Sequence, residues 1–284
     1  FKNDKKGLAG RFKIIGQVLL GVFVAIIMYS HPDIVIKENL NTESEIDLKQ
    51  TEQIIIDSAA FSENKKSLKT TIPFLKHNQL DYSNFFFNVD NNLLVFLIFA
   101  FIVIFIITAV SNSANLTDGI DGLATGCSAI IGATLGVFCY VSGNMVFANY
   151  LDIMYIPSVS ELVVFMSSFV GACVGFLWYN SYPAQVFMGD IGSLSLGGII
   201  GVFSILIRKE LLIPIFCGVF FIESLSVILQ VSYFKYTKKK YGTGKRIFLM
   251  SPLHHHFQKQ GIHESKIVTR FWIVCVFICL LAFV

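Results

Sequence analysis

Three aspartates in two glycine-rich segments are the residues of this chain best suited to chemistry. Asp118 and Asp121 lie in the segment 115–122, and Asp190 lies in the segment 187–193. Each segment stands between long apolar runs, where a carboxylate is costly unless a partner compensates its charge. Proteins bind Mg²⁺ through one or two carboxylates together with phosphate oxygens and water. The pattern therefore predicts a bound cation and a phosphorylated ligand at a membrane surface.

The first aspartate pair stands where a helix is expected to start. If the helix over 123–141 begins near Thr117, Asp118 and Asp121 lie on one side of its first turn. The unpaired N–H groups and partial positive charge of a helix N-terminus suit an anion, and Mg²⁺ bridging the two carboxylates would remove their repulsion of a phosphate. The alternative is that both residues serve only as helix caps.

Asp190 repeats this arrangement, because it precedes Ser193 and a helix expected over 194–207. Upstream, Asn180 and Phe187 could recognise a base, the amide through hydrogen bonds and the ring through stacking. Trp178 and Tyr179 fit an interfacial aromatic belt better than a binding site.

A run of three histidines forms a third candidate segment. Ser251 can cap a helix, and Pro252 fits its first helical position. On that helix the histidine side chains fan out at about 100° intervals, so they cannot all bind one metal, but one or two could contact phosphate or move a proton. The alternative is a solvated basic loop. The candidate side chains here are Lys245, Arg246, His254, His255 and His256.

Composition predicts an all-α polytopic membrane bundle. The chain is 54% hydrophobic and 14% charged with a mean hydropathy of +0.67, whereas soluble domains are about a quarter charged. Seven apolar stretches approach the roughly 20 residues that cross a bilayer. The six cysteines all lie in apolar runs and are expected to be small packing residues rather than disulfide or zinc ligands. The expected spans are 12–30, 93–111, 123–141, 160–179, 194–207, 211–233 and 267–284.

Alternation of these spans places every candidate segment on one side of the membrane. That side also carries the basic loops 1–11 and 234–266, so the positive-inside bias predicts that it is cytoplasmic. The polar insertion 31–92 then faces the other, periplasmic side within a single integral membrane domain, 1–284. The insertion is either a partner-binding or lipid-surface cap, or a variable segment without chemistry.

Glu223 is an acidic residue inside the apolar run 211–233, and such residues are functional candidates by default. The sequence favours neither a functional role for Glu223 nor a structural one, in which it hydrogen-bonds to neighbouring helices. Glu223 is the one feature that favours a membrane transporter or channel as a competing hypothesis. A non-catalytic fragment or scaffold is the third.

The segments 112–123, 179–193 and 244–257 together resemble the phospho-N-acetylmuramoyl-pentapeptide transferase family, within the polyprenyl-phosphate N-acetylhexosamine-1-phosphate transferases. The resemblance covers nearly all of the chain except 31–92. It implies ten membrane helices, of which the seven expected spans are the last seven. It also implies an acidic pair upstream of Phe1, so the sequence is expected to be an incomplete enzyme without that candidate for the catalytic base.

The resemblance implies an Mg²⁺-dependent reaction of peptidoglycan biosynthesis in the bacterial cytoplasmic membrane, with the site on the cytoplasmic face. Undecaprenyl phosphate attacks UDP-N-acetylmuramoyl-pentapeptide, giving lipid I and UMP. No nucleic-acid partner is expected, and monomer and homodimer are both open. The residues carried over are Asp190 as metal ligand; Asp118 and Asp121 at the nucleotide and diphosphate; Asn180 and Phe187 at uridine; His254 and His255 at the phosphates or sugar; and Asn115, Lys245, Arg246 and His256 in substrate binding.

Overall fold

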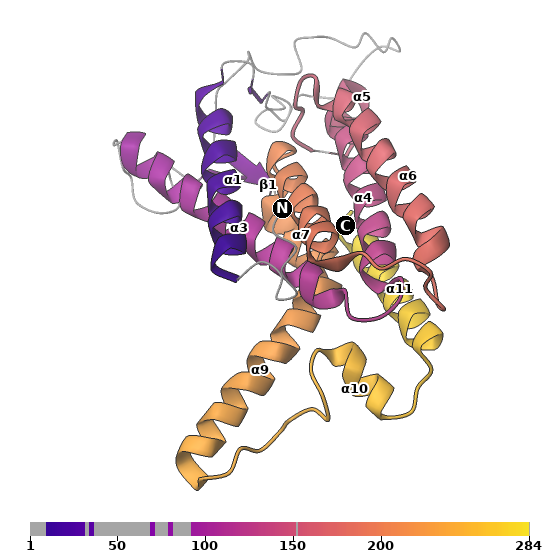
Figure 1. Cartoon of the computed structure of the whole chain (residues 1–284). Coiled ribbons are helices and arrows are strands. Elements are labelled where there is room, and N and C mark those ends of the chain that lie inside the picture. Colours follow the sequence, from indigo (N-terminus) through magenta and orange to yellow (C-terminus); the bar gives the residue numbers. More distant parts are fainter. Residues whose placement is uncertain are drawn as a thin grey trace, which may run out of the picture.

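The protein folds as a helical membrane bundle. Our computed structural model describes residues 10–31, 34–36, 69–71, 79–81, 92–151 and 153–283. Within these residues six helices are long and apolar enough to cross a bilayer, which confirms the predicted polytopic all-α architecture (Figure 1). They are α1 (Gly10–Ser30), α3 (Asn92–Thr117), α4 (Leu123–Ser142), α6 (Leu162–Asn180), α7 (Gly189–Leu206) and α9 (Gly218–Tyr241).

Shorter elements connect these helices. The 3₁₀ turn η3 (Val159–Glu161) leads into α6, and η4 (Glu210–Leu212) leads into α8 (Ile213–Phe216). Two strands of the polar insertion, β1 (Lys69–Thr71) and β2 (Gln79–Asp81), pair antiparallel with Thr70 opposite Leu80. The remaining described helices are α5 (Met145–Tyr150), α10 (Leu253–Lys259) and α11 (Glu264–Leu281).

The seventh predicted span differs from the structure in one respect. The stretch 267–284 forms α11, which starts at Glu264 and has 18 residues, so it is a helix as expected. It is not among the six candidate spans, because Glu264, Lys266 and Arg270 occupy its first two turns and shorten its apolar length. The helix nevertheless packs against α4, and its buried side includes Cys275 and Cys279.

The predicted span 211–233 is also divided. Pro214 stands in the first turn of α8, where its missing N–H costs no hydrogen bond. That helix ends at Phe216, and α9 begins at Gly218 and continues to Tyr241, eight residues beyond the predicted end. The extension brings Lys238, Lys239 and Lys240 into the last turn of α9, where positive charge complements the helix dipole.

Small residues let the central helices approach closely. α3 has the highest mean hydropathy of the spans, 3.4, and it packs against α1, α7 and α9. A Cβ added to Gly197 of α7 would lie 2.6 Å from the Cα of Ser111 and from the carbonyl oxygen of Val110, both in α3. The glycine is therefore required for this contact. All six cysteines are free and buried, which confirms their predicted role as packing residues.

The loop between α7 and α9 is tied to the polar insertion at the end of the bundle away from the three aspartates. The Thr71 N–H donates to the Arg208 carbonyl at 3.1 Å, and the Lys209 ammonium donates to the Thr71 hydroxyl at 2.8 Å. Burial lowers the pKa of Lys209 to about 7, against an opposing effect of the Glu210 charge. At least residues 69–71 of the insertion therefore belong to the folded structure.

Because the Lys209 ammonium is buried, we expect the free energy of unfolding to rise with pH. Below about pH 7 Lys209 is protonated in both the folded and unfolded states, and the cost of burying its charge is fully present. As the pH rises from about 7 towards the ordinary value of 10.5, the folded state binds fewer protons than the unfolded state, so stability increases. The unfolding temperature of detergent-solubilised protein should rise over this range, and Lys209→Met should flatten the rise. An unchanged slope in Lys209→Met would contradict this assignment.

Candidate functional site

The three aspartates lie at the same end of the bundle. Asp118 and Asp121 are in the turn 118–122 that joins α3 to α4, and Asp190 is in the first turn of α7. The predicted span 123–141 agrees with α4, but the helix does not begin near Thr117, which was the condition for Asp118 and Asp121 to share its first turn. The helix before the turn continues through Thr117, whose hydroxyl donates to the Ser113 carbonyl at 2.8 Å, and α4 begins only at Leu123 after Gly122 with φ 78°. α7 conversely begins five residues earlier than predicted, at Gly189.

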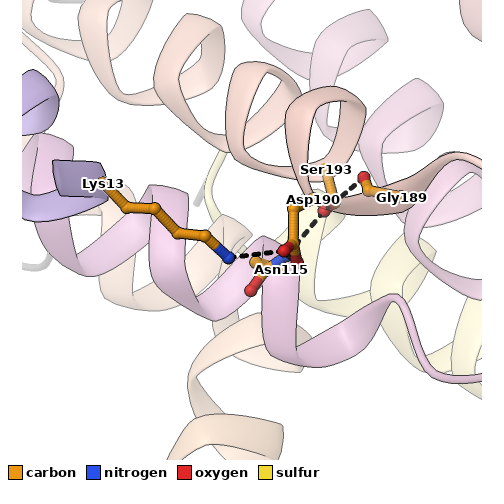
Figure 2. A network of polar contacts seen from close by, with 5 residues as sticks. All are labelled: Lys13, Asn115, Gly189, Asp190 and Ser193. Carbon is orange, nitrogen blue, oxygen red and sulfur yellow. Dashed lines mark hydrogen bonds and ion pairs between the residues drawn. The ribbon is translucent and has the colours of Figure 1, made fainter. Parts of the chain in front are cut away.

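Asp190 is held by side chains from two other helices (Figure 2). Its carboxylate accepts from the Lys13 ammonium of α1 at 2.5 Å and from the Asn115 amide of α3 at 2.9 Å. The same amide nitrogen donates to the Ser193 hydroxyl at 2.8 Å, and that hydroxyl donates to the Gly189 carbonyl. Asp190 also favours the start of α7 through the helix dipole. The network thus fixes where α1, α3 and α7 meet.

A second polar layer lies further along the same helices. Gln17 of α1 donates to the Ser111 hydroxyl at 3.1 Å and accepts from the Asn112 amide at 2.9 Å, while Ser111 donates to the Leu194 carbonyl. Sequence reasoning did not select Lys13 or Gln17 as site residues. The sequence does contain a sign of them, because two polar residues four positions apart in an apolar span lie on one face of a helix.

The Asp118 carboxyl is affected by its surroundings. Burial, and to a lesser extent the negative charge of Asp190, raise the pKa of Asp118 above its ordinary value. A cation bound near both carboxylates would offset this effect of the Asp190 charge. Asp190 by contrast has an exposed side chain, at 56%.

Asp121 and Asn180 hold the loop 181–188 against the start of α4. Asp121 accepts from the Ala184 N–H at 2.9 Å. Asn180, the last residue of α6, accepts from the Gly122 N–H and the Thr125 hydroxyl at 3.2 and 3.1 Å, and its amide donates to the Val186 carbonyl at 2.8 Å. Only 4% of Asn180 is exposed, so its polar groups are used within the protein.

The aromatic side chains near this loop, by contrast, are exposed. Phe187 is 75% exposed and stands just before α7, next to Met188 and the segment of Asp190. Trp178 and Tyr179, at the end of α6, are also exposed, at 81% and 52%. The exposure leaves the Phe187 ring available to stack on a planar ligand.

Three buried polar residues of α9, spaced by seven, hold the segment that follows it. The Thr237 hydroxyl accepts from the Lys245 N–H, and the Gln230 amide oxygen accepts from the N–H of Ile247 at 3.0 Å. Glu223 accepts from the His254 N–H at 3.4 Å. A spacing of seven residues is close to two helical turns, so these side chains share one face. We call Glu223, Gln230 and Thr237 the α9 polar seam; α9 extends beyond the other helices, and the chain returns from its end to α10 (Figure 1).

The three histidines have different surroundings. His254 is fully buried, with Nδ1 3.1 Å from the Glu223 Oε2. The ring of His255 is half-buried with Nδ1 2.6 Å from the Gln258 Oε1, and His256 accepts from the Leu249 N–H at 3.1 Å. Lys245 and Arg246 are exposed. The predicted Ser251 cap is wrong, because Pro252 occupies the N-cap position of α10 and the cap makes no side-chain hydrogen bond.

A metal site made by protein alone is not present in the part of the chain that the structure describes. No three His, Cys, Asp or Glu side chains converge there in a way that could hold a metal ion. Asp118 and Asp190 are the carboxylates that influence each other electrostatically, while Asp121 is bonded to the Ala184 backbone. Any divalent cation at this end of the bundle would therefore need further ligands from outside the protein.

An apolar groove leads away from the Asp190 network. It has a volume of about 530 Å³ and lies between α1, α3, α6 and α7. Lys13, Gln17 and Ser111 line its polar end, and Leu20, Phe165 and Phe203 are among the apolar residues of its wall. The groove thus joins a cation and a carboxylate to a surface suited to a hydrocarbon chain.

The fold and site together define a polytopic membrane protein with a polar, carboxylate-bearing site at one end of its helical bundle. Residues 66–208 match the family model described as glycosyl transferase family 4. That range includes the turn 118–122, Asn180 and Asp190.

Relatives of known name match over nearly the whole chain. The phospho-N-acetylmuramoyl-pentapeptide-transferases of Flavobacterium psychrophilum and Amoebophilus asiaticus are each 58% identical, with 100% of this chain and 69% of each relative covered. The protein of that name from Porphyromonas gingivalis W83 is 51% identical, with 96% of this chain and 68% of the relative covered. The chain belongs to the phospho-N-acetylmuramoyl-pentapeptide-transferase family.

The buried Asn180 amide gives a prediction about stability. Asn180→Ala would leave the Gly122 N–H, the Thr125 hydroxyl and the Val186 carbonyl without their partner. The free energy of unfolding should fall by about 1–3 kcal/mol, the usual cost of unsatisfied buried polar groups. Gln185→Ala, which removes an exposed amide from the same loop, is the control. Equal thermal unfolding of the two variants would contradict the bridging role of Asn180.

Proposed function

We propose that this enzyme transfers phospho-N-acetylmuramoyl-pentapeptide from UDP-N-acetylmuramoyl-pentapeptide to undecaprenyl phosphate, giving lipid I and UMP for peptidoglycan synthesis. Relatives that share more than half of the residues over the whole chain support this proposal. The structural observation that carries it is the network of Lys13, Asn115 and Asp190 beside Asp118, at the bundle end that also holds the histidine segment.

The reaction exchanges one phosphoanhydride for another. An oxygen of the acceptor phosphate forms a bond to the sugar-linked phosphorus, and the bond from that phosphorus to the UMP oxygen breaks. No ATP is needed, since the product keeps a diphosphate linkage. Two anions must approach each other, so the site has chiefly to neutralise charge and to fix the reacting groups in line.

The residues present fit a magnesium ion shared with the substrate. Asp190 and Asp118 would hold it, with Asp190 the principal ligand, and phosphate oxygens and water would supply its remaining ligands. The electrostatic influence of Asp190 on Asp118 supports this, because a cation between the carboxylates would offset their repulsion. When bound, Mg²⁺ would neutralise the diphosphate and stabilise charge that develops on it during transfer.

Other residues of the chain would bind and orient the two substrates. Asn115 holds the Asp190 carboxylate, and Lys13 brings a positive charge to the place where the acceptor phosphate must enter. The exposed Phe187 would stack on uracil, and Asn180 would support it by fixing the neighbouring Val186 carbonyl. The side chains proposed for the diphosphate and sugar are Asp121, Lys245, Arg246 and His255, with His256 shaping their loop. His254 is fully buried, so it would act through the turn 118–122 that it supports rather than by touching the substrate.

The lipid acceptor would lie in the apolar groove. Its phosphate would sit at the polar end beside Lys13, and part of its hydrocarbon chain would run between α1 and α7 past Leu20. A chain that moves from the bilayer into this groove exchanges lipid contacts for protein contacts, so close packing rather than the hydrophobic effect would hold it there. One substrate can then come from the bilayer and the other from the aqueous phase.

We propose a cytoplasmic location for this end of the bundle in a bacterial cytoplasmic membrane. The basic residues of the α9 end, Lys238 to Lys240, support that orientation through the positive-inside bias. The insertion 31–92 and the loop of Lys209 would then lie on the periplasmic side, within one integral membrane domain. Glu223 has a partner in His254, so its presence in a membrane helix does not require a transport pathway.

The test of the proposed function is UMP release by the purified protein. Release should require Mg²⁺, undecaprenyl phosphate and the UDP-linked substrate together. Asp190→Asn should reduce turnover at least about a hundredfold, since it removes charge from the metal-binding group. The control is Glu161→Gln, an exposed acid at the opposite end of α6. Near-normal turnover by Asp190→Asn, in protein with unchanged thermal unfolding, would contradict the metal-binding role.

A bulky residue in the groove should weaken binding of the lipid substrate and leave binding of the nucleotide substrate unchanged. A Cβ added to Gly198 of α7 meets no atom within 4 Å, so Gly198→Leu fills the groove without displacing the helix. We expect the KM for undecaprenyl phosphate to rise about tenfold, equivalent to about 1.4 kcal/mol, with the nucleotide KM unchanged. Gly175→Leu on α6, which is equally free of neighbours but outside the groove, is the matched control. Equal KM values for both variants would exclude this groove as the acceptor site.

A further inference from the structure

Glu223 is a fully buried carboxylate that the proposed reaction does not use. It lies in the second turn of α9, and none of its side chain is exposed. A buried carboxylate is costly unless it is paired and hydrogen-bonded. Its other oxygen, Oε1, has no hydrogen-bond partner among the described residues. The position of Glu223 therefore calls for an explanation beyond packing.

The partner of Glu223 is the first residue of the histidine run. Its Oε2 lies 3.1 Å from the His254 Nδ1 and accepts from the His254 N–H at 3.4 Å. The ring nitrogen is within hydrogen-bonding distance, although the angle between the two groups is not that of a hydrogen bond. Catalytic hydrogen bonds are often poorly aligned before a ligand binds. Glu223 thus contacts both the backbone and the ring of one residue.

The opposite edge of the His254 ring faces the aspartate turn. A Cβ added to Gly119 would lie 2.2 Å from the His254 Nε2 and 2.8 Å from its Cε1. Only a glycine fits between the ring and the turn without displacing one of them. Gly119 immediately follows Asp118 and stands two residues before Asp121, so the ring supports the segment that carries both carboxylates.

Glu223 differs from the two other members of the α9 polar seam. Gln230 and Thr237 bond only to backbone groups, those of Ile247, Phe248 and Lys245 in the returning segment and, for the Thr237 hydroxyl, carbonyls of α9 itself. Their role is accounted for by docking that segment on α9. Glu223 alone reaches a side chain, and that side chain touches the turn between two candidate site residues.

We propose that Glu223 is a positioning residue for His254. It fixes the ring so that Nδ1 faces Glu223 and Nε2 faces the turn 118–122, which in turn holds Asp118 in place. A carboxylate next to one ring nitrogen of histidine places a proton on that nitrogen and sets the role of the other. The effect of Glu223 on turnover rests on the proposed function. Its effect on the tautomer of the His254 ring does not.

The first measurement reads the ring directly and needs no turnover. In the purified protein labelled with ¹⁵N-histidine, the His254 signals, assigned by their loss in His254→Gln, should report Nδ1 as the protonated nitrogen. Glu223→Ala should change the ring's tautomer or broaden its signals. Thr237→Val, which alters the same seam away from the ring, should leave them unchanged. Unchanged His254 signals in Glu223→Ala would overturn the proposal.

The second measurement is turnover. Loss of a group that orients an active-site residue typically costs about 10- to 100-fold. We expect a loss of this size in kcat for Glu223→Ala and a smaller one for Glu223→Gln, whose amide oxygen can still accept from Nδ1. Glu210→Gln also removes a buried carboxylate, but from the opposite end of the bundle, and should keep turnover within about twofold of the unmodified protein, as expected for sites that do not couple.

The outcomes distinguish the two proposals. If the unmodified protein does not release UMP but Glu223→Ala changes the His254 signals, the proposed function fails and the positioning role stands. If Glu223→Ala fails to fold, Glu223→Gln carries both measurements. A turnover loss in Glu223→Ala no larger than that in Glu210→Gln would mean a purely structural role for Glu223 and overturn the inference.

Discussion

A polar group within a membrane bundle must find its partner inside the protein, and this constraint organises the structure. Lipid offers no hydrogen bonds, so several of the buried amides, hydroxyls and charges join neighbouring helices instead. Asp190 connects α1, α3 and α7 through Lys13 and Asn115, and Asn180 connects α6 to α4. The α9 polar seam does the same for the segment that leads to α10. The contacts that hold the helices together are thus largely those that shape the site.

The two ends of the bundle use this constraint differently. At one end, Lys209 and Thr71 join a loop to a strand of the insertion, with the ammonium buried and its charge disfavoured. At the other end the charged side chains of Asp190, Lys245 and Arg246 are exposed, and so is the ring of Phe187. A closed polar cluster gives a rigid connection, whereas an open one leaves capacity for a ligand. That difference supports the placement of the reaction at the aspartate end.

Charge balance explains why the site is made from several helices. The negative charge of Asp190 helps to raise the pKa of Asp118, after burial, and Lys13 of a third helix pairs with Asp190. A reaction between a lipid phosphate and a nucleotide diphosphate adds still more negative charge, which a divalent cation and the basic loop after α9 would offset. Close glycine contacts, such as Gly119 against His254 and Gly197 against Ser111, fix the positions of the segments that carry these charges. Electrostatic stabilisation is effective only when its groups are held in place beforehand.

The sequence by itself determined the membrane class and most of the helical spans, and it selected the three segments of the candidate site. Long apolar runs and rare charges leave few alternatives in lipid, so Asp118, Asp121, Asp190 and the histidines could be selected from their flanking sequence. It did not determine where helices meet. The ion pair of Lys13 with Asp190 and the burial of His254 on Glu223 depend on contacts across 177 and 31 residues of chain. Local sequence patterns carry no information about such distant partners, because packing selects them only when the helices assemble.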